Sequence, residues 1–380
     1  MKKTIPYGHQ WIDQSDIDAV VAVLKGDWLT QGPKVSEFED AVAKYCGAKY
    51  AVAVSSGTAA LHAAYSVAGI GFGDEIITTP ITFSATAAAA IYCGAKPIFA
   101  DIEKNTLNID LAEVEKKITQ KTKAIVPVDF AGHPCDYGKI KKIVQKHNLL
   151  VIADAAHSLG SEYEGKKIGS MADMTILSFH PVKTITAGEG GMVLTNNRIF
   201  FDKLRLFRQH YAVKIPKMGG WYYEIQGLGY NYRLTDIQCA LGLSQIKKLD
   251  MFIKRRREIV AKYDAEFKNI AEIKIREEKN YAKSAWHLYA IQLNLELLNV
   301  GRKMIFEELQ KQGIGVQVHY IPLNLHPFYQ KKFGYRSGDF PVAENYYRRA
   351  ISLPLFPKMT DTEIEEVVST VKDIIKIHKK

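Results

Sequence analysis

A lysine and an aspartate, each placed just after a strand-like run, are the side chains best suited to chemistry in this sequence. Asp154 ends the apolar run 149–154, and Lys183 follows the apolar run 174–179. Short apolar runs of this kind are typical of strands buried on both faces of a mostly parallel sheet. Ligands of such sheets bind beyond the carboxyl ends of the strands. The sequence therefore predicts an amine and a carboxylate in one ligand site.

This pair of groups suits pyridoxal phosphate. The cofactor needs an amine that binds its aldehyde covalently and a carboxylate that pairs with its pyridine nitrogen. A carboxylate in that position keeps the nitrogen protonated, which makes the ring an electron sink. Alone, each residue is weak evidence, because most lysines are solvated and an aspartate after a strand can simply cap a turn. Together, on an α/β scaffold, Lys183 and Asp154 predict this cofactor.

Other nearby residues allow either a functional or a structural interpretation. Gly57 and Thr58 follow a strand and open a helix, where free backbone N–H groups can hold a phosphate or form a plain N-cap. His157 could bind the phenolic oxygen of the cofactor or be a core histidine. Phe83 could stack on a planar ring or belong to the core. The segment 229–238 indicates only a loop before a helix.

The pattern of runs predicts a βαβ architecture followed by a smaller unit. We predict an N-terminal arm at residues 1–14, a large α/β domain at 15–250 and a small α+β domain at 251–380. Strands are expected at 50–54, 75–79, 96–100, 124–129, 149–154, 174–179 and 191–195, and helices at 59–68, 111–118 and 137–147. A helix at 235–267 leads to a strand at 286–293, a helix at 301–312 and a strand at 315–320.

Composition places the chain among ordinary globular proteins. It has 380 residues, of which 47% are hydrophobic and 24% charged. No segment approaches the 18 or more apolar residues of a membrane span, and residues 1–7 lack the apolar region of a secretory signal. The four cysteines show no metal-binding spacing, which predicts reduced thiols and no metal site. We expect a cytoplasmic protein.

The net charge of +10 raises the question of nucleic-acid binding. The dense basic cluster at 254–257 continues as a helix with Glu258 and Lys262, which is typical of a solvated helix face. An anionic small molecule uses a positive balance equally well. We therefore predict no nucleic-acid partner and keep that class as a minor alternative.

Four segments together resemble one family of enzymes. The segments 55–61 (SSGTAAL), 154–161 (DAAHSLGS), 178–193 (SFHPVKTITAGEGGMV) and 231–246 (NYRLTDIQCALGLSQI) are similar to motifs of the DegT/DnrJ/EryC1/StrS family of pyridoxal phosphate-dependent sugar aminotransferases. With the segment 315–323, the resemblance covers nearly the whole chain. It implies the fold type I transferase architecture, with a large, mostly parallel sheet domain and a small C-terminal domain. It also implies a homodimer in which each active site is completed by the neighbouring subunit.

The resemblance assigns cofactor contacts residue by residue. Lys183 would bind the cofactor covalently and Asp154 would pair with its ring nitrogen. The remaining contacts would be Gly57, Thr58 and Ser178 at the phosphate, Phe83 against the ring, His157 near the phenolic oxygen, and Asn231 at the phosphate of the other subunit's cofactor. Relatives with histidine in place of the lysine are dehydratases, so Lys183 indicates transamination. Thr184 departs from the asparagine of many relatives, while the lysine itself is kept.

Within the family, the segment 6–33 and the segment 316–322 resemble enzymes that aminate a UDP-linked 4-keto-6-deoxy-N-acetyl-hexosamine at C4, in the pathway to pseudaminic acid. L-glutamate is the expected amino donor. The residues implied to line the substrate site are Tyr7, Asp27, Trp28, Leu29, Thr30, Ser56, Gln317, Val318, His319 and Tyr320. A perosamine-type enzyme acting on a GDP-linked ketosugar is the alternative within this chemistry. A non-catalytic regulatory relative is the alternative outside it, and the intact Lys183 and Asp154 argue against it.

Overall fold

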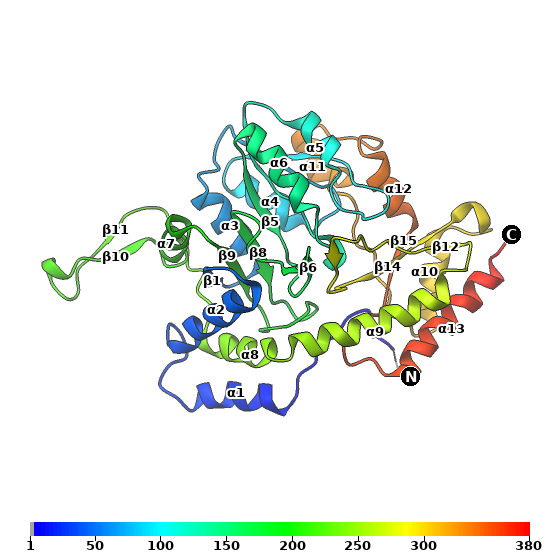
Figure 1. Cartoon of the computed structure of the whole chain (residues 1–380), viewed down its shortest axis with the longest axis horizontal. Helices are drawn as coiled ribbons and strands as arrows, with labels where there is room; N and C mark the ends of the chain where they lie inside the picture. Colours follow the sequence, from blue (N-terminus) through cyan, green and yellow to red (C-terminus); the bar gives the residue numbers. More distant parts are fainter. Residues whose placement is uncertain (1–3) are drawn as a thin grey trace.

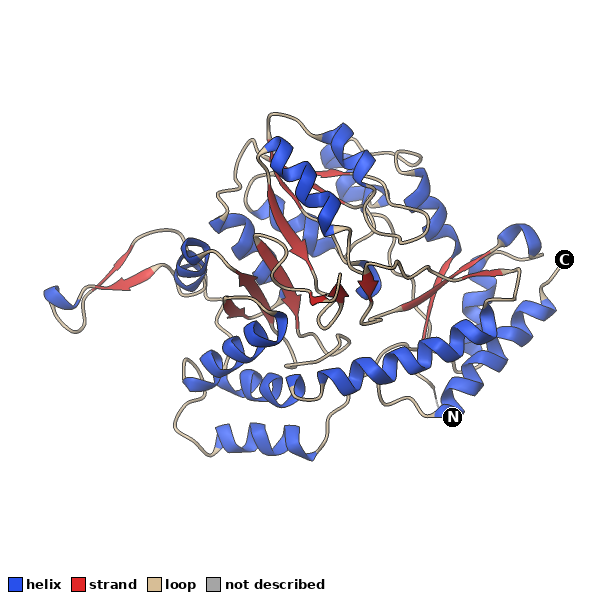
Figure 2. Ribbon diagram, viewed as in Figure 1, coloured by secondary structure: helices blue, strands red, loops and turns tan. Residues whose placement is uncertain are grey.

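The computed structural model describes residues 4–380 and is built around a seven-stranded sheet (Figures 1 and 2). Its strand order is β1-β9-β8-β5-β4-β2-β3, and β9 runs antiparallel to both of its neighbours while the other pairs are parallel. The strands are β1 (Tyr50–Val54), β2 (Glu75–Thr78), β3 (Lys96–Phe99), β4 (Thr122–Ile125), β5 (Leu150–Asp154), β8 (Met174–Ser178) and β9 (Gly191–Thr195). The predicted mixed, mostly parallel α/β sheet is thus confirmed.

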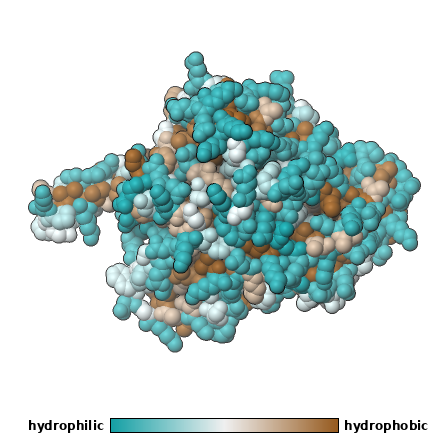
Figure 3. Space-filling view, viewed as in Figure 1, coloured by the Kyte–Doolittle hydropathy of each residue, from teal (hydrophilic) through white to brown (hydrophobic). Residues whose placement is uncertain are grey.

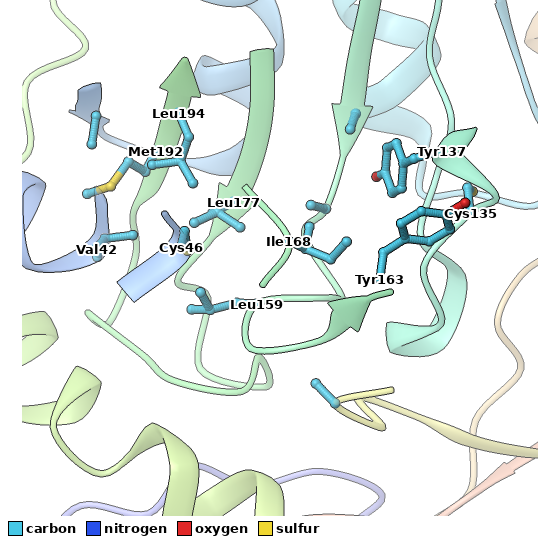
Figure 4. Close-up of a cluster of buried hydrophobic side chains, with 14 of the residues drawn as sticks. Val42, Cys46, Cys135, Tyr137, Leu159, Tyr163, Ile168, Leu177, Met192 and Leu194 are labelled. Carbon is cyan, nitrogen blue, oxygen red and sulfur yellow. The ribbon is translucent and has the colours of Figure 1, made fainter. Parts of the chain in front are cut away.

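Helices cover both faces of this sheet because successive strand residues alternate between two buried clusters. Leu177 and Leu194 join one cluster with α2 (Pro33–Cys46), α6 (Tyr137–His147) and α8 (Asp236–Ile246), part of which is drawn in Figure 4. Ile176 and Val193 join the other cluster, with α3 (Gly57–Val67), α4 (Ser84–Tyr92) and α7 (Arg198–Phe207). The short helix α5 (Leu111–Lys117) adds Leu111 to the first cluster. Each fully buried aliphatic side chain stabilises the fold by about 1.5–3 kcal/mol.

The C-terminal part has its own core. This part of the chain contains α9 (Leu249–Phe267), α10 (Arg302–Lys311), α11 (Pro327–Phe333), α12 (Pro341–Arg349) and α13 (Asp361–Ile377). It also contains the sheet of β12 (Ile273–Lys274), β14 (Tyr289–Leu293) and β15 (Ala350–Leu353). Buried residues from Ile259 to Ile375 form one cluster here, and Ile5 of the arm joins them. The helix α9 runs through residue 250 without a break, so the proposed division at 250/251 falls inside a helix and stays a prediction.

The N-terminal segment reaches the C-terminal part before α1 (Gln14–Leu24) returns to pack on α8. Ile5 accepts a hydrogen bond from the Gly315 N–H (2.7 Å) and donates its own N–H to the Gly313 carbonyl (2.9 Å). Residues 4–13 contain no helix, as expected for an arm, and residues 1–3 of the predicted arm lie outside the described residues. The arm therefore lies against a region more than 300 positions later in the sequence.

Several predicted elements differ from the structure, among them the strand expected at 286–293, which begins only at Tyr289. The helix expected at 235–267 is divided into α8 and α9, with Lys247 and Lys248 between them. The strand expected at 124–129 ends at Ile125, because Pro127 has no N–H to continue the ladder, and Val128 forms only an isolated bridge. The strand expected at 315–320 is absent, and only Gln317 forms a bridge, with Ser352.

A two-stranded hairpin extends away from the body of the molecule (Figure 1). It comprises β10 (Ala212–Lys214) and β11 (Tyr223–Ile225) and was not predicted from the sequence. Its exposed large side chains are Met218, Trp221, Tyr223 and Ile225. Brown, hydrophobic surface is visible along the hairpin in Figure 3. A second small sheet combines β6 (Glu162–Tyr163), β7 (Lys166–Lys167) and β13 (Ala282–Lys283). Between residues 4 and 380, no helix is both long and apolar enough to span a membrane.

Candidate active site

A cavity of about 730 Å³ lies where the carboxyl ends of β1, β5 and β8 meet the start of α3. The C-terminal part and the N-terminal arm close its other side. The predicted site residues that line it are Tyr7, Ser56, Gly57, Thr58, Phe83, Asp154, His157, Ser178, Lys183, His319 and Tyr320. The structure thus brings most of the predicted cofactor contacts into one space.

Lys183 lies in the loop after β8, where its backbone N–H donates to the His180 carbonyl (2.9 Å). Its side chain is partly buried in the cavity wall, and its amine makes no hydrogen bond or ion pair with any described residue. Burial lowers the pKa of this amine to about 8, while the negative charge of Asp154 opposes the shift. A substantial fraction of the amine is therefore neutral, and nucleophilic, near neutral pH.

Asp154 ends β5 and is buried at the floor of the cavity. The Thr86 hydroxyl donates to its Oδ2 (2.6 Å), and the Ala156 N–H donates to its Oδ1 (3.2 Å). Burial raises the pKa of this carboxyl, whereas the two hydrogen bonds and the charge of Lys183 lower it. No cation of the described chain forms an ion pair with it. A protonated ring nitrogen would supply the missing counter-charge, so this residue fits the expected cofactor.

The start of α3 forms a cradle for an anion. Ser56 caps the helix, since its hydroxyl accepts from the Ala59 N–H (3.1 Å), and the free N–H groups of the first turn face the cavity end of the helix. A Cβ atom at Gly57 would lie 3.1 Å from the Cβ of Ser178, and one at Gly191 would clash with the Ser56 carbonyl. Glycine at these two positions lets β8 and β9 approach the helix terminus closely. Helix N-termini of this kind bind phosphate groups.

Two further predicted contacts border the same space. Phe83, just before α4, is 61% exposed, and its ring centroid lies 6.4 Å from that of Tyr320. His157 is buried and accepts a hydrogen bond from the Ala131 N–H at Nδ1 (3.3 Å), while its Nε2 lies 3.1 Å from the Tyr320 hydroxyl. Their predicted contacts with the cofactor ring and its phenolic oxygen stay predictions.

Several predicted residues do not line this cavity within a single chain. Asn231, Asp27, Trp28, Leu29 and Thr30 are exposed and lie near the start of α8, where Leu29 accepts from the Asp236 N–H (3.0 Å) and Thr30 bridges Thr235. The carbonyl of Tyr232, next to Asn231, accepts from the Ser55 N–H (2.8 Å). The segment of Asn231 thus lies beside the anion cradle, with its side chain turned to the surface.

Gln317 and Val318 are also absent from the cavity wall, although the two residues that follow them line it. Gln317 instead exchanges backbone hydrogen bonds with Ser352. For both residues, and for those near the start of α8, the predicted substrate or cofactor role stays a prediction.

Thr86 and His287 are among the polar residues of the site that sequence reasoning did not assign. Thr86, which bonds Asp154, lies one turn after Phe83 in α4, but nothing in the local sequence shows that its hydroxyl faces a strand end. His287 lines the cavity from the loop before β14, in a stretch that the pattern predicts as a strand. Its position depends on how the C-terminal part packs on the large sheet, which the local pattern cannot reveal.

Comparison with known proteins identifies the family. A profile described as the DegT/DnrJ/EryC1/StrS aminotransferase family matches residues 10–372. The chain belongs to this family. It is therefore an aminotransferase, and because aminotransferases of this family depend on pyridoxal phosphate, the predicted enzyme class and cofactor are confirmed.

Two relatives and one solved structure show how close the similarity is. The chain is 44% identical over 378 residues to the spore coat polysaccharide biosynthesis protein SpsC of Bacillus subtilis, covering 98% of this chain and 97% of the other. It is 44% identical over 379 residues to a UDP-4-amino-4,6-dideoxy-N-acetyl-β-L-altrosamine transaminase of Campylobacter jejuni, covering 99% of each. The structure of PseC from Helicobacter pylori superposes with a TM-score of 0.94 at 36% identity, covering 99% of this chain and 100% of the other. These matches confirm the predicted aminotransferase fold.

The pKa of Lys183 leads to a prediction about cofactor attachment. With a pKa of about 8, roughly a quarter of the amine is neutral at pH 7.5, against about 0.1% for an unshifted lysine. The rate of covalent attachment to the cofactor-free protein should therefore rise with pH and level off above about pH 8. Stopped-flow absorption in the visible, with pyridoxal phosphate in excess, measures this rate. A rate that still rises tenfold per pH unit above pH 9 would contradict the lowered pKa.

Proposed function

We propose that this enzyme transfers an amino group from L-glutamate to C4 of a UDP-linked 4-keto-6-deoxy-N-acetyl-hexosamine. The product is UDP-4-amino-4,6-dideoxy-N-acetyl-β-L-altrosamine, an intermediate of pseudaminic acid biosynthesis. The observation that carries the chemistry is one cavity that combines Lys183, Asp154 and the anion cradle of α3. The substrate is supported by the Campylobacter jejuni relative of that name, which matches over 99% of both chains, and by PseC.

Each group of residues in the cavity has a separate role in transamination. When bound, pyridoxal phosphate supplies an electron sink for the negative charge that develops on the substrate carbon. The Nζ atom of Lys183, with its pKa near 8, can take a proton from that carbon and return one, because the free amine is present near neutral pH. Asp154 would hold the proton on the ring nitrogen, and the N-terminus of α3 with Ser178 would hold the phosphate.

The size of the cavity and the net charge of the chain suit a nucleotide sugar. A volume of about 730 Å³ falls within the usual range of small-molecule sites, about 300–1,000 Å³. The net charge of +10 favours the approach of a diphosphate-linked substrate.

A direct assay tests the proposed substrate. Purified enzyme, saturated with pyridoxal phosphate and L-glutamate, is incubated with UDP-linked and GDP-linked 4-ketosugars, and amination is followed by mass spectrometry. We expect amination of the UDP-linked N-acetyl-hexosamine. Amination of the GDP-linked sugar alone would favour the perosamine-type alternative. Absence of amination in a protein that binds the cofactor at Lys183 would favour a regulatory relative.

We infer that the enzyme works as a homodimer in which the two chains share their active sites. Trp28 (60% exposed) and Leu29 (49% exposed) lie near the start of α8, and Asn231, which precedes this helix, is exposed as well. The hairpin carries Trp221, 82% exposed, away from the body of its own chain. Large exposed apolar side chains of this kind are typical of surfaces that contact another protein. The cytoplasmic location expected from the sequence stays a prediction.

A complementation experiment tests the shared site. The Lys183→Ala and Asn231→Ala homodimers are each expected to have little activity. If Asn231 serves the partner's site, a heterodimer of the two has one site with both lesions and one site with none. Co-expression with two different tags, followed by tandem purification, should then recover up to about half of the wild-type activity per dimer.

A control heterodimer is available in the same chain. Lys183→Ala combined with Asp154→Asn places one lesion in each site, because both residues line the cavity of their own chain. This heterodimer should keep at most roughly 5% of the wild-type activity per dimer, because its one site with an intact lysine carries the Asp154→Asn change. Failure of the Asn231 heterodimer to exceed this control would place Asn231 in the site of its own subunit or outside the site.

A further inference from the structure

The segment that ends at His287 is held in a conformation that is unusual for an L-residue. Trp286 has a φ angle of +50°, in the left-handed region. Its N–H donates to the Ser284 hydroxyl (3.0 Å), and the buried Arg256 donates to the carbonyls of both Trp286 (3.3 Å) and His287 (3.2 Å). The guanidinium of Arg276 stacks on the Trp286 indole at 4.2 Å. Backbone strain that is fixed by this many partners is concentrated at functional sites.

The result of this arrangement is that His287 lies directly against His157. Their ring centroids are 4.4 Å apart, with the planes tilted by 45°, and both side chains are buried. Gly132 lies between the segments of Trp286 and His157. A Cβ atom at this position would lie only 2.9 Å from the Trp286 nitrogen and 3.0 Å from the His157 carbonyl. The Nδ1 atom of His287 is buried and has no hydrogen-bond partner among residues 4–380. Within the chain, the contact with His157 is therefore made by ring packing.

The hydrogen bonds of His157 have a fixed direction. The Ala131 N–H can only donate, so Nδ1 of His157 must accept and carries no proton. Burial and the charge of Lys183 lower the pKa of His157 well below its usual range, which keeps the ring neutral with a single proton. That proton is on Nε2, which then donates to the Tyr320 hydroxyl at 3.1 Å.

This direction leaves the Tyr320 proton unused by the protein. The hydroxyl accepts from His157, and no other hydrogen-bond partner for it exists in the described chain. Tyr320 lines the cavity, and burial raises the pKa of its phenol, so it stays protonated. A hydroxyl in this state can satisfy its proton only by donating to an acceptor in the cavity.

We propose that Ala131, His157 and Tyr320 form a directed hydrogen-bond chain that presents the Tyr320 hydroxyl as a donor to an acceptor oxygen of the bound ligand, with His287 as the positioning residue that holds His157 in this chain. The acceptor is the phenolic oxygen of the cofactor or the keto oxygen of the sugar. Only the second of these sources rests on the proposed function.

The first arm of the test uses the protein without cofactor or substrate. Nitrogen-15 NMR of histidine-labelled protein, with His157 assigned from a His157→Gln variant, reports which ring nitrogen carries the proton. We expect the Nε2–H form at pH 7 in the wild type and a loss of that single form in His287→Ala. A cationic or Nδ1-protonated His157 in the wild type would overturn the proposal, whatever the substrate is.

The second arm identifies the acceptor through the Tyr320→Phe variant. With pyridoxal phosphate alone, loss of a donor to the phenolic oxygen should raise the pH midpoint of the visible band, because that donor stabilises the anionic oxygen. An unchanged midpoint, with an amination step at least tenfold slower in kcat, would assign the keto oxygen instead. If neither quantity changes, Tyr320 donates to no ligand oxygen and the proposal fails.

The third arm tests whether His287 acts through the chain. His287→Ala should reproduce the change seen in Tyr320→Phe, and the double variant should be no worse than either single variant. His287→Phe keeps a ring against His157 and provides a second variant if alanine unfolds the protein, as checked by circular dichroism. This variant should restore the Nε2–H form of His157. Effects of His287→Ala and Tyr320→Phe that simply add would remove His287 from the chain.

Discussion

Replacement of Lys183 with alanine is expected to reduce transamination by at least about 10³-fold. The amine is placed to bind the cofactor and to move the substrate proton, and positioned acid–base groups alone contribute roughly 10²–10⁴-fold. Its pKa of about 8 makes this the lysine suited to act near neutral pH. Borohydride reduction of the wild-type holoenzyme, followed by peptide mapping, should place the cofactor on Lys183 and on no other lysine.

Lys167 offers a matched control, because it is also half-buried but pairs with Glu162 (3.0 Å) outside the cavity. Lys167→Ala should retain the rate of the wild type within about twofold, since surface ion pairs contribute at most about 1 kcal/mol to stability. It should also leave the borohydride label unchanged. A label on another lysine, or a Lys183→Ala variant with ordinary turnover, would show that the central assignment is wrong.

Replacement of Asp154 with asparagine is expected to preserve cofactor binding while kcat falls about 10- to 150-fold. The side chains have the same shape, so the hydrogen bond from Thr86 can be kept, but the amide has no charge to hold the proton on the ring nitrogen. One charge-assisted hydrogen bond contributes about 1.5–3 kcal/mol, which converts to that range of rates. Because the bond supports charge that develops during the reaction, the loss should appear in kcat more than in KM.

Asp101 is the control for this second experiment. It is also a buried carboxylate, but it accepts from the N–H groups of Val342 and Ala343 (both 2.9 Å) at the start of α12, outside the cavity. Asp101→Asn should lower the melting temperature and leave kcat of the folded enzyme close to the wild-type value. A near-normal kcat in Asp154→Asn would remove the proposed role of that residue.

The strands and their ends were the part of the structure that the sequence predicted best. Continuous apolar runs gave the bounds of β1 and β9 without error, because strands buried on both faces need such runs. The rule that ligands bind at the carboxyl ends of parallel strands then brought Asp154, Ser178 and Lys183 together. These predictions use only local composition and one topological rule.

The residues that come from distant parts of the chain were harder to predict. His287 has no local signal, since its position depends on the strained Trp286 and on the buried Arg256. Tyr7 and Tyr320 were placed by family resemblance, and their contact with the cavity requires the C-terminal part to pack on the large sheet. The role proposed for Asn231 in the partner's site stays a prediction, because the fold of one subunit leaves this side chain exposed.

The docking of the N-terminal arm sets the order in which the site can be completed during synthesis. Ile5 pairs with Gly313 and Gly315, and the carbonyl of Tyr7 accepts from the Leu355 N–H (3.0 Å). Residues 5–7 thus wait for partners that are made more than 300 positions later, whereas the seven strands of the large sheet are all present by residue 195. Chains are made at about 5–20 residues per second, so the 160 residues from 195 to 355 take roughly 8–30 seconds. During that time a nascent chain can hold a formed sheet and a cradle for phosphate, yet still lack the wall that Tyr7 supplies.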